Sequence, residues 1–94
     1  MFRLDEHLTV YLHREQVDFR LSINGLATMV EQSLSMSPFA ESAYVFSNRR
    51  PDRVKIIGWD RNGFWLLLKR LEQDRFIWPT LQDVPTLTVE QLRF

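Results

Sequence analysis

The residues best suited to chemistry in this sequence are cations gathered in its middle third. Residues 49–75 hold eight Lys or Arg against four acids, whereas residues 1–48 hold three Arg against six acids. A guanidinium binds phosphate through two parallel N–H groups, and each phosphate contact strengthens binding at low salt by releasing counterions. The block therefore predicts a nucleic-acid-binding surface, to which we assign Arg49, Arg50, Arg53, Lys55, Lys69, Arg70 and Arg75.

A second interpretation gives the same cations a structural role. In this interpretation the cations lie at the solvent-exposed rim of the fold and form ion pairs with the acids beside them, which are Asp52, Asp60, Glu72 and Asp74. In that case the tryptophans are core residues, whereas in the first interpretation Trp59 or Trp78 stacks on an unpaired base. The formal net charge of zero predicts weak, nonspecific DNA affinity at best.

Catalysis is not predicted for this chain. Asp52 follows a proline as in a restriction-type nuclease motif, but that motif needs an acid two residues before a Lys, and both Lys55 and Lys69 lack one. His7 and His13 do not have the spacing of a zinc-binding HExxH helix, and the chain contains no Cys. Three scattered glycines do not make a phosphate loop. We therefore expect no catalytic residue, no metal site and no cofactor.

Two periodic patterns of hydrophobic residues, one helical and one alternating, predict the helix and the strands that position the cations. A helical period places one inward face on Phe19, Ile23, Leu26, Val30 and Leu34. Asp18 is the expected N-cap of this helix, and Gly25 within it predicts a close backbone contact. The helix is expected to end within residues 35–37, because the residue before Pro38 avoids the helical conformation.

Alternating patterns predict strands at residues 10–12, 43–47, 53–59 and 64–71, with a short additional strand at 75–78 and a helix at 88–94. Asn62-Gly63 is a strong hairpin signal because both residues tolerate positive φ, so the strands flanking it are expected to be antiparallel neighbours. The expected fold class is α+β. It consists of an antiparallel three- to four-stranded sheet, one main helix packed on one face, and a short C-terminal helix.

The hairpin assigns side chains to faces whichever turn it uses. The numbers of two paired residues add up to 125 for a two-residue turn at Asn62-Gly63 and to 123 for a four-residue loop. Because both sums are odd, odd-numbered residues of one strand share a face with even-numbered residues of the other. One face therefore carries Arg53, Lys55 and Arg70 near the open end, with Ile57, Trp59, Leu66 and Leu68 toward the turn. The opposite face carries Val54, Ile56, Trp65, Leu67 and Leu71.

Composition is typical of one folded domain, which we expect over residues 1–94. Hydrophobic residues make up 45% of the chain and aromatic residues 13%, which suits a small core. The absence of Cys excludes disulfides and is consistent with a reducing compartment. The N-terminus is charged where a secretory signal is apolar, and no apolar run exceeds five residues. We therefore expect a cytoplasmic protein without membrane contact.

Several short motifs resemble one family. In order they are Asp18-Phe19-Arg20, Gly25-Leu26, Pro38-Phe39, Val45-Phe46, Asn48-Arg49-Arg50, Lys55, Trp59-Asp60, Gly63, Lys69-Arg70-Leu71-Glu72, Arg75-Phe76 and Trp78-Pro79. Over about residues 9–92 they are similar to the TnpB, or Orf-two-like, accessory proteins of insertion sequences of the IS sixty-six type. Leu21 and Asp74 depart from the pattern, since many relatives carry Lys and Gly there.

The resemblance implies a mobile element that encodes a separate, larger transposase, and a role in transposition. The leading hypothesis is a non-catalytic accessory protein that assists the transposase through weak DNA contact by the basic residues. The alternative is a protein–protein adaptor that binds the transposase without contacting DNA, for which exposed apolar residues would be suited. A third possibility is a decayed copy that folds without a role. The sequence predicts no oligomeric state.

Overall fold

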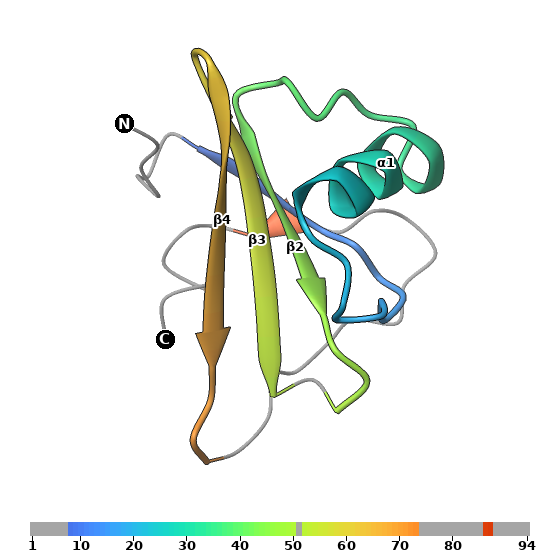
Figure 1. Cartoon of the computed structure of the whole chain (residues 1–94), viewed down its shortest axis with the longest axis vertical. Coiled ribbons are helices and arrows are strands. Elements are labelled where there is room, and N and C mark those ends of the chain that lie inside the picture. The colour runs from blue at the N-terminus through green and yellow to red at the C-terminus, as the bar shows by residue number, and fades with distance from the viewer. Residues whose placement is uncertain (1–7, 51, 74–85, 88–94) are drawn as a thin grey trace.

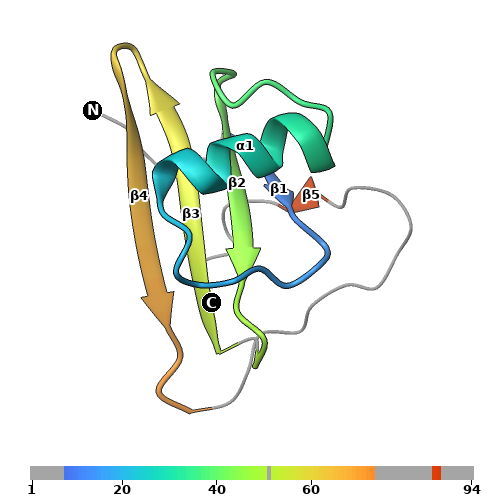
Figure 2. The same ribbon diagram turned by 45° about the vertical axis from the view of Figure 1, so that its right-hand side comes forward.

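One helix lies against a five-stranded sheet in the part of the chain that the structure describes (Figures 1 and 2). This computed structural model describes residues 8–50, 52–73 and 86–87. The elements are β1 Thr9–Leu12, α1 Ile23–Ser33, β2 Ser42–Ser47, β3 Arg53–Asp60, β4 Gly63–Arg70 and β5 Thr86–Leu87. Their order across the sheet is β4-β3-β2-β1-β5. The α+β class is therefore confirmed.

The sheet is mixed, so the prediction of a purely antiparallel sheet is wrong. β1 runs parallel to β2, with Thr9 opposite Ser42, whereas β2–β3, β3–β4 and β1–β5 are antiparallel pairs. The cause is the connection, because a parallel neighbour needs a crossover of a dozen or more residues, and residues 13–41 with α1 supply it. The predicted strand at 75–78 and helix at 88–94 lie outside the described residues.

The helix begins four residues later than predicted. Its N-cap is Ser22, so the prediction of Asp18 at this position is wrong. The Asp18 carboxylate instead accepts hydrogen bonds from the backbone N–H and the guanidinium of Arg20, which close a local turn. Phe19 lies in that turn rather than on the inward face of the helix.

The C-terminal end of α1 is at Ser33, slightly before the predicted end within residues 35–37. Ser35 adopts a left-handed φ of 54°, which stops the helix. A close contact is present at Gly25, but it is with a side chain and not with backbone as predicted, because a Cβ there would lie 2.7 Å from Cδ2 of Leu21. Gly25 therefore lets the segment leading into the helix pack against it.

β3 and β4 form the predicted hairpin in one of the two predicted registers. Arg53 lies opposite Arg70, so paired positions sum to 123 and the predicted assignment of side chains to faces is confirmed. The loop is nevertheless two residues long. Its left-handed residue is Arg61, with a φ of 52°, rather than the expected Asn62-Gly63 pair.

Apolar side chains are buried on both faces of the sheet. On the α1 face the buried cluster is Leu26, Val30, Tyr44, Phe46 and Ile57. On the opposite face it is Val10, Leu12, Ala43, Val45, Val54 and Ile56. Burial of each large side chain stabilises the fold by about 1.5–3 kcal/mol, so the central strands β2 and β3 hold the molecule together. Among the described residues, α1 is too short and too polar to cross a bilayer.

Candidate nucleic-acid interface

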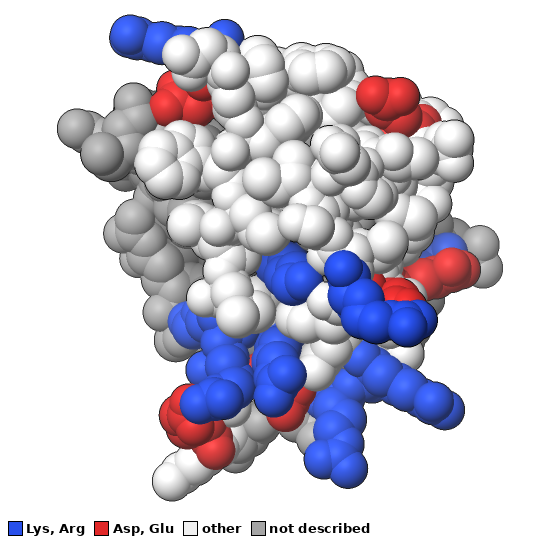
Figure 3. Space-filling view, in the orientation of Figure 1, with Lys and Arg blue, Asp and Glu red and all other residues white. Residues whose placement is uncertain are grey.

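One end of the sheet is basic. Figure 3 shows Lys and Arg gathered where β2 ends, β3 begins and β4 ends. The loop between β2 and β3 contributes Arg49 and Arg50, and the strand ends contribute Arg53, Lys69 and Arg70. We call these five residues the basic end. Five of the seven residues predicted from the sequence therefore come together.

The loop that carries Arg49 and Arg50 is held by Asn48. The Asn48 side-chain oxygen accepts hydrogen bonds from the N–H groups of Asp52 and Arg53, at 3.2 and 3.1 Å. Its Nδ2 donates to Oδ1 of Asp52 at 2.6 Å. This bond is the main cause that lowers the pKa of Asp52, and a backbone hydrogen bond and then the charges of Arg53 and Arg50 lower it further. The two arginines therefore lie between residues that are hydrogen-bonded to each other.

Arg53 and Arg70 are direct partners across β3 and β4. Both are exposed, and like charges facing each other in a sheet lower its stability. Arg70 is partly neutralised, because its guanidinium lies 2.8 Å from Glu72, as the second interpretation of the sequence predicted for this acid. Within the described residues, Arg53 has no ion pair.

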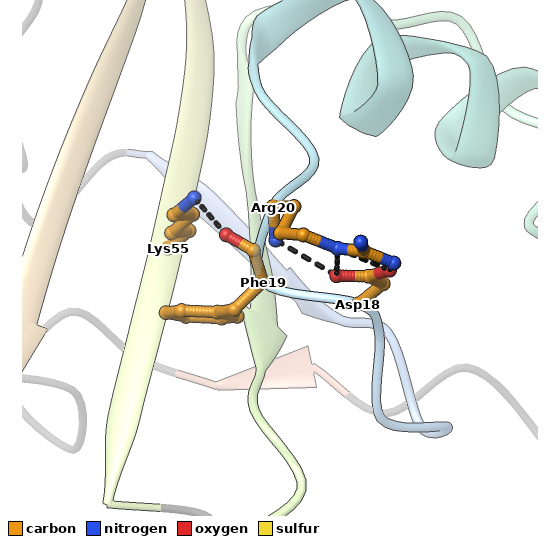
Figure 4. Close-up of polar contacts among 4 residues, drawn as sticks. All are labelled: Asp18, Phe19, Arg20 and Lys55. Carbon is orange, nitrogen blue, oxygen red and sulfur yellow. Dashed lines mark hydrogen bonds and ion pairs between the residues drawn. The ribbon is translucent and has the colours of Figure 1, made fainter.

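Lys55 has a different environment from the basic end. Its ammonium donates to the backbone carbonyl of Phe19 at 2.7 Å and lies 4.7 Å from the centre of the Phe19 ring (Figure 4). It also donates to the backbone carbonyl of Leu21 at 2.9 Å. Lys55 is half-buried and joins β3 to the segment before α1. Its charge is therefore used to hold the fold.

Asp18 and Arg20 form a bidentate ion pair in that same segment (Figure 4). The guanidinium lies 2.6 Å from Oδ2 of Asp18, and the Arg20 N–H donates to Oδ1 at 2.9 Å. Both side chains are exposed to solvent. The pair shapes the turn between residues 18 and 20, and it satisfies the charge of Arg20 locally.

The carboxyl group of Asp18 is expected to titrate with a midpoint near pH 2. Hydrogen bonds from the side chain and then the backbone of Arg20 hold the pKa of Asp18 at about 2, against an ordinary 3.8. Because the folded-state pKa is the lower one, the stabilisation is present above about 3.8 and is lost as pH falls toward 2. NMR of the carboxyl carbon measures the midpoint. Arg20→Ala should return it toward 3.8, and a wild-type midpoint already there would contradict the ion pair.

A pocket of about 490 Å³ adjoins the basic end, between residues 16–19 and 48–50. The N–H of Val17 donates to the carbonyl of Ser47 at 3.0 Å and joins the two walls. The lining residues are Gln16, Val17, Asp18, Phe19, Asn48, Arg49 and Arg50. Sequence reasoning assigned no binding role to residues 16–19 and missed the part played by Asn48. An Asn just before a short polar loop is typical of a side chain that hydrogen-bonds to its own turn, and this signal was present.

The remaining predicted residues are placed differently. Lys69 lies at the basic end but on the face opposite Arg53, because its partner is Val54. Trp59 packs against Phe39 and Phe64, with ring centres 5.0 Å apart in each case, near the hairpin loop. It is therefore half-buried and some 20 Å of strand from the basic end. Arg75 and Trp78 lie outside the described residues.

One family and two relatives are similar to this chain in sequence. A family described as IS66 Orf2 like protein matches residues 8–94. Uncharacterized protein y4jC of Sinorhizobium fredii is 37% identical over 76 residues, which cover 81% of this chain and 65% of that protein. Uncharacterized protein y4hO of the same organism is 30% identical over 77 residues, covering 82% and 67%. The chain thus spans about two thirds of the length of these relatives. No solved structure matches it.

Proposed function

Because this chain belongs to the family of IS66 Orf2-like proteins of insertion sequences, we propose that it is a non-catalytic accessory protein whose basic end contacts DNA phosphates. In this proposal it assists the element's transposase in the cytoplasm. Within the described residues there is no cluster of three or more His, Cys, Asp or Glu side chains that could hold a metal ion.

The observation that carries the proposal is the exposed charge of the three arginines Arg49, Arg50 and Arg53 at the basic end. Arg49, Arg50 and Arg53 are exposed, and within residues 8–50 and 52–73 none of them forms an ion pair. Arg53 also faces Arg70 across the hairpin. An arrangement that costs stability in the free protein is relieved when a polyanion binds between the two guanidinium groups.

The hydrogen bonds of Asn48 favour binding as well. Ordering a flexible side chain or loop on binding costs free energy, and the bonds from Asp52 and Arg53 to Asn48 reduce that cost by joining the residues on either side of Arg49 and Arg50. Phosphate contacts carry no sequence information by themselves, so the expected binding is nonspecific and strongly weakened by salt.

Fluorescence anisotropy with a labelled duplex tests the proposal. Binding is expected at about 50 mM salt and should be largely lost at about 200 mM. The double variant Arg49→Ala plus Arg53→Ala is expected to bind far more weakly. Arg61→Asn is the matched control, because it removes one exposed arginine at the opposite end of the hairpin and Asn tolerates the left-handed backbone there.

Absence of binding at low salt, or equal binding by the double variant, would overturn the DNA proposal. The adaptor hypothesis would then take its place. Its own test is co-purification with the transposase after nuclease treatment, since an adaptor holds its partner without DNA.

A further inference from the structure

β4 is an edge strand with an apolar surface. In the described part of the chain it pairs only with β3, along all eight residues. Its side chains include Leu68, which is 63% exposed, and Trp65, which is 44% exposed. A long, apolar edge with unpaired backbone groups is a template for pairing with another strand, and proteins that do not use such an edge usually protect it with charge or proline.

The hairpin register shows which backbone groups of β4 point outward. The N–H of Leu71 donates to the carbonyl of Asp52 at 2.8 Å, so position 71 points toward β3. Hydrogen-bonding direction alternates along an antiparallel strand, and odd-numbered positions of β4 therefore face β3. The outward groups belong to the even-numbered positions: Phe64, Leu66, Leu68 and Arg70.

We propose that a second copy of this chain pairs with β4 in antiparallel fashion, with Leu67 of both copies on the two-fold axis. The two-fold axis runs perpendicular to the sheet, so α1 of both copies lies on the same side of the joined sheet. Residues on the α1 face of one copy then pair with residues on the α1 face of the other, which are the even-numbered positions of β4. Of the possible registers, the one centred on Leu67 pairs all four outward residues with one another. Phe64 then faces Arg70 of the partner subunit, and Leu66 faces Leu68 of the partner subunit.

This register is chemically self-complementary on both faces. On the α1 face it sets a leucine against a leucine, and a guanidinium against a phenyl ring. On the opposite face it sets exposed Trp65 against Lys69 of the partner subunit, which is again a cation beside an aromatic ring. Antiparallel pairing also places the two basic ends at opposite ends of the joined strands, where a parallel arrangement would bring like charges together.

The mass of the wild-type protein in solution tests the proposal without DNA, so its outcome is independent of the proposed function. Light scattering across a concentration series is expected to show a dimer. Leu68→Pro removes an outward N–H in both copies and should raise the dissociation constant at least about tenfold. Leu68→Thr shortens the same apolar side chain but keeps the N–H, so it should dimerise better than Leu68→Pro. A wild-type protein that is monomeric throughout overturns the proposal.

Single cysteines test the register, because the natural chain contains no Cys. Paired positions without mutual hydrogen bonds have Cα atoms about 4.5 Å apart, within disulfide range, so Leu67→Cys should cross-link under mild oxidation. Leu66→Cys and Leu68→Cys should not, since each would lie about 9 Å from its own counterpart. Cross-linking of either control in preference to Leu67→Cys overturns this register. These variants decide the question even if Leu68→Pro does not fold.

Discussion

Lys55→Met is expected to lower the free energy of unfolding by about 2–3 kcal/mol. The methionine keeps the length of the side chain but leaves the carbonyls of Phe19 and Leu21 without the ammonium that now binds both. Hydrogen bonds to a charged group are stronger than neutral ones, and the group is half-buried, so the loss exceeds that at an exposed lysine. Urea unfolding followed by tryptophan fluorescence measures the change.

Arg53→Met is the matched control for this prediction. It removes a cation two residues earlier on the same strand and the same face, but from an exposed position with no ion pair in the described chain. Its stability should lie within about 0.5 kcal/mol of the wild type. Equal effects of the two substitutions would mean that Lys55 does not hold the segment before α1 in solution.

Reversing the charge at Arg49, Arg50 and Arg53 together should abolish DNA binding, with a loss of more than about a hundredfold at low salt. In the Arg49→Glu, Arg50→Glu, Arg53→Glu variant, three candidate phosphate contacts become repulsive. The same change should alter stability by less than about 0.5 kcal/mol, because the attraction gained between position 53 and Arg70 is offset by repulsion of Asp52 from positions 50 and 53. Anisotropy titration and urea unfolding measure the two effects on one sample.

The difference in size between these two effects distinguishes a binding role from a structural one. Residues kept for binding give loss of function with little change in stability when they are replaced. A triple variant that is markedly less stable would show that the arginines belong to the fold. Unchanged DNA binding by a folded triple variant would place the contact elsewhere on the molecule.

The sheet was predictable where local patterns determine it. Period-two alternation and the Asn62-Gly63 signal predicted the β3–β4 hairpin. They also predicted that the numbers of paired residues add up to an odd number, because a one-residue slip would move every apolar side chain to the wrong face. The parallel pairing of β1 with β2 was missed although a strand, a helix and a strand follow one another in the sequence. That order is typical of a parallel crossover, in which the helix carries the chain back to the start of the next strand.

The site was predictable as a charge block but not residue by residue. Lys55 and Arg53 share a face and a strand, and only the position of the 19–21 segment gives one of them two carbonyl partners. That contact connects residues more than thirty positions apart, which no local pattern reports. The late start of α1 has a related origin, because Asp18 binds Arg20 and Lys55 binds the carbonyls of residues 19 and 21 before the helix begins.

The salt dependence of DNA affinity tests the central claim most directly, namely that the basic end binds phosphates while Lys55 supports the fold. The slope of log K against log salt should fall by about 2 in the Arg49→Ala plus Arg53→Ala variant, because each lost phosphate contact removes about 0.9. In folded Lys55→Met the slope should equal that of the wild type. A slope that falls in Lys55→Met and stays constant in the double variant would contradict the account.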